Sequence, residues 1–187
     1  MRVWLCWAHG TGKTTILKLF DRPKITEIAR DAIGELWMSL NEMDFKTKIA
    51  FQQIIFWRQL QRERSMQDFI SDRTVFDNLA YMSAIGDTEE LKFMEERVKL
   101  HIEQNPYDFI LYFPIEFPLE DDWLRYTGDE FQAEIDKRIL FYLDKYGVKY
   151  YTVTGPVEER KKFIDATLNY ENTWAPRNLL TPRYHLV

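Results

Sequence analysis

The sequence predicts an α/β fold of three layers, with helices on both faces of a mostly parallel sheet of five strands. Two observations predict it. Short apolar runs of strand length alternate with helix-length segments along the chain, and a glycine-containing loop joins the first strand to the first helix. Strands that are separated by helices pair in parallel, because a crossover is needed to return the chain to the same edge. With 187 residues, 45% of them hydrophobic, the chain is long enough for one domain with a substantial core.

The elements follow in order from the residue pattern. Arg2 begins a continuous apolar run, and Pro23 ends the first helix because proline cannot continue one. The long helix has apolar residues at helical spacing, Phe45, Ile49, Phe56 and Leu60, which predict one buried side. The expected strands are 2–7, 24–27, 68–71, 108–113 and 150–153, and the expected helices are 14–20, 29–40, 44–63, 74–84, 89–104, 129–146 and 157–168. A C-terminal tail, about 171–187, is expected to be irregular.

Charge and composition narrow the classes of function. The net charge of −5 does not suit a general nucleic-acid binder, although a local basic groove stays open. Cys6 is the single cysteine, which rules out an internal disulfide and a cysteine-based metal cluster. No apolar run approaches the roughly 20 residues that span a bilayer. We therefore expect no membrane segment. Because the first residues do not have the pattern of a signal peptide, we expect an intracellular, cytoplasmic protein, and a homodimer is compatible with the sequence.

The loop after the first strand carries a phosphate-binding pattern. Residues 7–14 read W-A-H-G-T-G-K-T, and the last three match the end of the P-loop pattern G-x-x-x-x-G-K-[ST]. Backbone amides and a helix N-terminus there would hold ATP, Lys13 would neutralise the phosphates, and Thr14 would bind Mg²⁺. Trp7 departs from the pattern, which has glycine there, and a chance Gly-Lys-Thr is the alternative. The expected ATP-binding residues are His9, Gly10, Thr11, Gly12, Lys13, Thr14 and Thr15.

A second acidic motif follows the third predicted strand. Asp72 at a strand's carboxyl end can hold Mg²⁺ through water or accept a proton from an attacking hydroxyl. Arg73 beside it is a candidate to clamp an acceptor phosphate. The alternative is that Asp72 caps the next helix, since Asp before Arg-Thr is a good N-cap.

The order of these motifs resembles a known group of enzymes. The segment 72–81, D-R-T-V-F-D-N-L-A-Y, looks like part of P-loop nucleoside and nucleotide kinases. Residues 118–125 (PLEDDWLR), 134–136 (EID) and 155–160 (GPVEER) resemble the ribosylnicotinamide-kinase domain and related AAA-like predicted ATPases and kinases. The resemblance implies a fold like that of nucleoside-monophosphate kinases and ATP-dependent phosphorylation, and it leaves the acceptor open.

The resemblance also suggests where the acceptor binds. Thymidylate-type kinases have a segment similar to 26–30, which contacts the acceptor, so Glu27 is a candidate general base and Arg30 an acceptor clamp. A helix-start glutamate with an exposed arginine is the alternative for this pair. Arg58 on the long helix is a further candidate for acceptor binding, and one or two rings could stack on a base: Phe51, Trp57, Tyr81 and Trp123.

The resemblance implies that residues 118–130, approximately, form a lid, which in such kinases supplies an arginine to the transferring phosphoryl group. Arg125 is the first candidate and Arg138 the second, and an exposed acidic loop with one counter-charge is the alternative.

Three functions follow from these motifs. The first is a kinase that transfers phosphate from ATP·Mg²⁺ to a nucleoside, a nucleotide or a related small acceptor. The second is a kinase acting on a hydroxyl of DNA, for which Arg177 and Arg183 of the tail are candidate strand contacts. The third is a regulatory ATPase without an acceptor.

Overall fold

A parallel sheet forms the centre of the computed structural model, which describes residues 1–6, 13–18, 20–26, 28–36, 42–116 and 129–172. Within these residues the sheet has five strands in the order β2-β3-β1-β4-β5, and every paired neighbour is parallel. The strands are β1 Arg2–Cys6, β2 Lys24–Ile25, β3 Phe69–Asp72, β4 Phe109–Tyr112 and β5 Tyr151–Thr152. The helices are α1 Lys13–Lys18, α2 Ile28–Leu36, α3 Phe45–Ser65, α4 Val75–Ile85, α5 Glu89–Gln104, α6 Asp129–Lys145 and α7 Val157–Asn172. The predicted α/β class and five-stranded sheet are confirmed.

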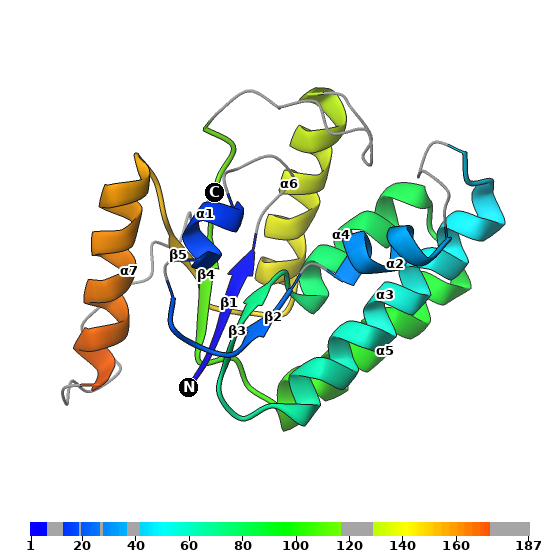
Figure 1. Ribbon diagram of the computed structural model, residues 1–187. Coiled ribbons are helices and arrows are strands. Elements are labelled where there is room, and N and C mark those ends of the chain that lie inside the picture. Colours follow the sequence, from blue (N-terminus) through cyan, green and yellow to red (C-terminus); the bar gives the residue numbers. More distant parts are fainter. Residues whose placement is uncertain (7–12, 19, 27, 37–41, 117–128, 173–187) are drawn as a thin grey trace.

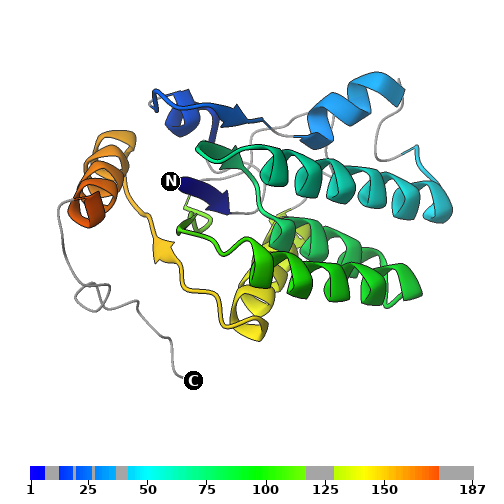
Figure 2. The same cartoon turned by 90° about the horizontal axis from the view of Figure 1, so that it is seen from below.

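Helices cover both faces of the sheet, as Figures 1 and 2 show. The short α1 and the C-terminal α7 lie on one face, and the layer containing α3, α4, α5 and α6 lies on the other. Residues that are consecutive in β1 point to opposite faces, because side chains alternate along a strand. Val3 and Leu5 pack with α1 and α7, whereas Trp4 packs on the other side against Phe69 and Tyr107, with ring centroids 5.0 and 4.1 Å away.

The same alternation places neighbouring residues of β3 on opposite faces of the sheet. Ile70 belongs to the apolar cluster under α1 and α7. Asp72, two residues further on, therefore faces that side, where its register partner in β1 is Leu5. Ser71 faces the opposite side, toward α3, and contacts Gln59 there. The acidic group thus lies on the same face as the helix that follows the phosphate-binding motif.

Three long helices begin at polar caps. The Asp44 side chain accepts a hydrogen bond from the Thr47 amide at the start of α3, and Thr88 accepts one from Leu91 at the start of α5. Thr74 caps α4 as described below. None of the described helices is long and apolar enough to cross a bilayer.

The buried stripe of α3 differs from the predicted one. Phe45, which we expected on the buried side, is 56% exposed. Two polar residues, Gln59 and Glu63, are buried instead at 2% and 0% exposure. Apolar periodicity alone misses these residues, because their polar groups are compensated by partners on other elements that the pattern of one helix does not reveal.

Candidate functional site

The carboxyl ends of β1, β3 and β4 meet at one edge of the sheet, where Cys6, Asp72 and Tyr112 are the last strand residues. Ligands of open α/β sheets bind at this edge. Strand β1 ends at Cys6 and α1 begins at Lys13, so the strand and the helix that flank the phosphate motif are both present. His9, Gly10, Thr11 and Gly12 lie outside the described residues, as do the side chains of Lys13, Thr14 and Thr15. Their predicted roles therefore stay predictions.

Asp72 does not cap α4, so the alternative interpretation of this residue is wrong. The N-cap is Thr74, whose hydroxyl accepts hydrogen bonds from the amides of Phe76 and Asp77 at 3.1 and 3.2 Å. The Asp77 carboxylate in turn accepts a hydrogen bond from the Thr74 amide at 2.8 Å, and the two residues thus form a capping box. Because this box satisfies the helix start, the carboxylate of Asp72, 6% exposed, is not needed there.

Arg73 has an unusual backbone for a residue with a side chain. Its φ is 117°, and it is the one non-glycine residue with positive φ among the described residues. Such a conformation costs on the order of 1–3 kcal/mol and persists only where the surroundings fix it. The side chain is 10% exposed and forms an ion pair with Asp77 at 3.4 Å. Its guanidinium lies 5.4 Å from the ring centroid of Tyr81. The predicted phosphate clamp is thus held between a helix start and an aromatic ring.

A buried polar network lies behind Arg73 and was not foreseen from the sequence. Gln59 Nε2 is 2.7 Å from Glu63 Oε1, 3.0 Å from Ser71 Oγ and 3.3 Å from the Arg73 carbonyl oxygen. Glu63 Oε2 is also 2.8 Å from His101 Nε2. We call these four residues, Gln59, Glu63, Ser71 and His101, the Gln59 network. All four are at most 2% exposed, so each depends on the others to satisfy its polar groups.

Cys6 at the end of β1 is a structural residue. Its Sγ lies 3.7 Å from the Thr74 hydroxyl, which joins the end of β1 to the start of α4. Burial raises the pKa of the Cys6 thiol well above its usual range, and the charge of Asp77 raises it further. The thiol is therefore protonated at neutral pH and is a poor nucleophile.

Tyr112 and Asp136 form a hydrogen-bonded pair at the end of β4. The Tyr112 hydroxyl donates to Asp136 Oδ2 at 2.7 Å. Burial raises the pKa of Asp136, while the bond from Tyr112 opposes that shift. Asp136 belongs to the EID motif at 134–136, which marked this segment in the sequence without revealing the partner on β4.

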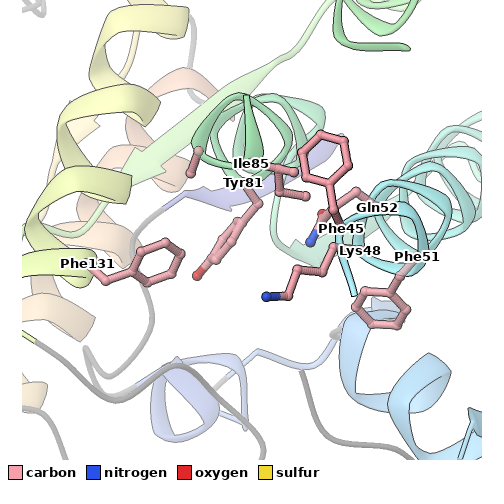
Figure 3. Close-up of a pocket in the computed structure, with 8 residues that line it drawn as sticks. Phe45, Lys48, Phe51, Gln52, Tyr81, Ile85 and Phe131 are labelled. Atoms are coloured by element: carbon pink, nitrogen blue, oxygen red, sulfur yellow. The ribbon is translucent and has the colours of Figure 1, made fainter. Parts of the chain in front are cut away.

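A cavity of about 360 Å³ lies between α3, α4 and α6 (Figure 3). This volume is in the range of small-molecule sites. In Figure 3 the Tyr81 hydroxyl and the Lys48 amino group point toward the same space, and the ring of Phe131 lies across from Tyr81 with centroids 6.3 Å apart. The lining residues are Phe45, Lys48, Phe51, Gln52, Tyr81, Ala84, Ile85 and Phe131. The cavity therefore has aromatic walls and three polar groups, on Lys48, Gln52 and Tyr81, that can orient a ligand.

Tyr81 connects this cavity to the end of β3, because the same ring lines the cavity and lies against Arg73. Of the four rings proposed from the sequence, Phe51 and Tyr81 line the cavity. Trp57 is 43% exposed and contacts Phe56 and Phe93 instead, and Trp123 lies outside the described residues. Phe131 was missed, since it sits at the start of α6, far along the chain from the other rings.

The remaining candidate arginines lie on three different helices. Arg58 forms two hydrogen bonds with Glu35, at 2.9 and 2.7 Å, and so joins α3 to α2 at the surface. These bonds lower the pKa of Glu35. Arg138 binds Glu134 on α6 and donates to the Ser83 carbonyl on α4 at 3.1 Å. Arg30 is on α2 and exposed, with an interaction of its own.

Several predicted groups lie outside the described residues. These are Glu27, the segment 117–128 that contains Arg125 and most of the predicted lid, and the tail with Arg177 and Arg183. Among the described residues, no group of three acidic, histidine or cysteine side chains gathers as a metal site.

Comparison with known proteins decides the family. A family model described as AAA domain matches residues 2–160. The chain belongs to the AAA domain family. Among curated proteins, no sequence matches this AAA domain. The sequence-based resemblance to P-loop kinases of nucleosides and nucleotides is confirmed by this match together with the solved structures that follow.

The AAA domain is similar in fold to several P-loop kinases. The NadR protein in complex with NR has a TM-score of 0.71 at 18% identity, over 94% of this chain and 51% of that one. Deoxyadenosine kinase from M. mycoides with bound dCTP has a TM-score of 0.66 at 16% identity, over 91% and 100%. Shikimate kinase from Aquifex aeolicus has a TM-score of 0.54 at 16% identity, over 92% and 99%. The chain thus spans about half the length of NadR and nearly all of the other two.

Proposed function

We propose that this AAA domain transfers the γ-phosphoryl group of ATP to a nucleoside, a nucleotide or a related small acceptor. The observation that carries the proposal is the position of residues 72 and 73. Asp72 faces the side of the sheet where α1 follows the phosphate motif, and Arg73 contacts Tyr81, which lines the aromatic cavity. A donor at the motif and an acceptor in the cavity would therefore lie on either side of these two residues.

The nucleotide would be held by the loop between β1 and α1. Backbone amides of this loop and Lys13 would bind the phosphates, with Thr14 and Asp72 available to Mg²⁺. The chemistry of Asp72 fits this ion, because Mg²⁺ prefers hard oxygen ligands and the carboxylate stands at the carboxyl end of the strand next to β1. When bound, Mg²⁺ neutralises charge on the phosphates as the phosphoryl group is transferred.

The acceptor would bind in the cavity between α3, α4 and α6. Flat rings stack favourably on aromatic walls, and Gln52 and Lys48 offer hydrogen bonds to polar groups on such a ring. NadR has been crystallised with NR, and deoxyadenosine kinase with dCTP and dATP, so proteins of this fold bind such molecules.

The residues would divide the chemistry according to the acceptor. For a nucleoside, Asp72 or Glu27 accepts the proton of the attacking hydroxyl. For a monophosphate no base is required, and positioning with charge neutralisation carries the reaction. Arg73 and Arg30 are the proposed acceptor clamps, Arg58 is a weaker candidate because it already binds Glu35, and Arg125 is the proposed lid arginine. Use of ATP also implies an intracellular location.

The direct test is transfer of label from γ-labelled ATP with Mg²⁺. The purified protein is incubated with separate pools of nucleosides, nucleoside monophosphates, and single- or double-stranded oligonucleotides. Label on a small molecule, lost in Lys13→Ala, supports the proposal. Label on an oligonucleotide would instead indicate a DNA kinase, and release of free phosphate alone would indicate an ATPase without an acceptor; either result contradicts the proposal.

A further inference from the structure

The peptide groups on both sides of the Arg73 Cα are fixed by hydrogen bonds to different elements. The Arg73 amide donates to the Leu5 carbonyl on β1 at 3.1 Å. The Arg73 carbonyl accepts from Ser71 Oγ at 2.8 Å and from Gln59 Nε2 at 3.3 Å. Because the amide fixes one rotation about this Cα and the carbonyl fixes the other, the two together hold the residue at its φ of 117°.

The side chains that donate to the Arg73 carbonyl are themselves fixed by further buried hydrogen bonds. Gln59 shares its amide protons between Ser71 Oγ, the Arg73 carbonyl and Glu63, and Glu63 is in turn bonded to His101 on α5. A chain of contacts therefore runs from α5 through α3 to the end of β3. Apolar residues of similar volume would fill this space without the desolvation of four polar side chains.

The Gln59 network determines the direction of the Arg73 side chain, because it fixes the backbone of that residue. An ordinary extended or helical backbone at this position would turn the side chain away from its present partners. In the observed conformation the guanidinium reaches Asp77 and lies 5.4 Å from the ring of Tyr81, at the wall of the cavity shown in Figure 3. Asp77 is fixed as well, because its other oxygen accepts from the Thr74 amide.

We infer that Gln59 and Ser71 are positioning residues, which hold the strained backbone of Arg73 so that its guanidinium lies against Tyr81 at the wall of the acceptor cavity. This inference rests on the proposed function for the identity of the ligand. The backbone part of it stands independently of that function. Neither residue was singled out by the sequence motifs, and neither lines the cavity.

The kinetic test compares Ser71→Ala and Gln59→Met with Ile164→Val, which shortens a fully buried side chain of α7 on the other face of the sheet. We expect the two network variants to lose at least about tenfold in kcat/KM for the acceptor, with ATP affinity changed less than about twofold. Ile164→Val should keep kcat/KM. If kcat/KM fell in all three variants in proportion to their loss of thermal stability, the network would serve packing alone and the inference would be overturned.

A double-variant cycle then asks whether the network acts through Arg73. Arg73→Ala removes the guanidinium, so adding Ser71→Ala to it should lower kcat/KM by less than about twofold. A full tenfold loss on top of Arg73→Ala would show that Ser71 acts elsewhere, and the inference would fail.

A crystal structure of the Ser71→Ala and Gln59→Met double variant provides a readout that needs no turnover. We expect φ at residue 73 to leave the positive region once both donors to its carbonyl are removed. A φ that stays near its present value would overturn the inference. If the unaltered protein transferred no label to any acceptor, the proposed function would fail, while this measurement would still decide the role of the network.

Discussion

Two turns of this AAA domain follow strands at the same edge of the sheet, and both hold a residue with positive φ. After β3 the residue is Arg73, with φ 117°, and after β5 it is Gly155, with φ 88°. Glycine adopts such angles at little cost, whereas a residue with a Cβ is strained there. Selection for stability alone favours the glycine solution, so an arginine at the first turn indicates that its side chain is needed.

The side chains that hold the two turns also differ in their exposure to water. The Gly155 amide donates to the Glu116 carboxylate at 3.0 and 3.1 Å, and Arg160 Nε donates to the Gly155 carbonyl at 2.7 Å. This carboxylate is 28% exposed, so water can reach it. The side chains that hold Arg73 belong to the fully buried Gln59 network. Buried side chains alone hold the Arg73 turn. Of the two side chains that hold the Gly155 turn, Arg160 is equally buried at 2% exposure, and Glu116 can exchange its partners for water.

The largest effect is expected on the free energy of unfolding, when the carboxylate behind each turn is removed. Glu63→Ala should lower the free energy of unfolding by about 3–5 kcal/mol, because it leaves His101 and Gln59 with unsatisfied polar atoms in a buried site. Glu116→Ala should lower it by less than Glu63→Ala does, because water can reach the position of the lost carboxylate and hydrate both the Gly155 amide and Arg160, the ion-pair partner of Glu116. Urea unfolding of both variants measures the difference. A loss from Glu116→Ala equal to that from Glu63→Ala would contradict the contrast between the two turns.

The next effect concerns chemistry beside the strained turn. Asp72→Asn should lower kcat by at least about a hundredfold, the size expected of a positioned acid–base or Mg²⁺-binding carboxylate. Asp68→Asn is the matched control, because Asp68 is a half-exposed aspartate just before the same strand, paired with Arg22 far from the carboxyl edge. Steady-state phosphoryl transfer with both variants provides the measurement. A near-normal rate for Asp72→Asn would remove Asp72 from the mechanism.

A smaller effect is expected at the glycine turn. Gly155→Ala should lower the free energy of unfolding by about 1–2 kcal/mol, because alanine is strained at this φ. Its Cβ would also approach Glu159 Oε2 to 2.8 Å, a contact that the flexible end of that side chain can relieve. Gly147→Ala provides a second left-handed glycine, with φ 61° and no atom near the added Cβ, so similar losses in both variants identify the backbone as the cause. An unchanged Gly155→Ala protein would mean that this turn tolerates a side chain without strain.

The smallest effect sharpens the comparison at Arg73 itself. Arg73→Gly should be more stable than Arg73→Ala by about 1 kcal/mol, since both lose the guanidinium and only alanine keeps the strain. Thermal unfolding of the pair measures this difference, and both should show the same impaired use of the acceptor. If Arg73→Ala were the more stable variant, the positive φ would not be a source of strain.

The sequence predicted the fold well because its signals are local. Alternating apolar segments placed the strands and helices, and the Gly-Lys-Thr motif predicted a helix from residue 14, one residue after the observed start of α1 at Lys13. Asp72 was found because a polar residue after an apolar strand stands out. Its interpretation required the structure, because Asp72 and Thr74 both have side chains that can cap a helix and only the observed bonds distinguish them.

The acceptor side of the site could not be predicted in this way. Phe131, Tyr81 and Phe45 come from three different helices, and their meeting around one cavity depends on how those helices pack. Gln59 and Glu63 look like surface residues of a long charged helix until His101 and Ser71 are placed beside them. Long-range packing of this kind leaves no signal in the periodicity of one segment.

The position of a bound nucleotide tests the central claim most directly. A crystal structure with a non-hydrolysable ATP analogue and Mg²⁺ should place the triphosphate in the loop between β1 and α1, with Mg²⁺ within reach of Asp72 and the aromatic cavity left for the acceptor. A nucleotide bound elsewhere, or a triphosphate far from Asp72, would contradict the account.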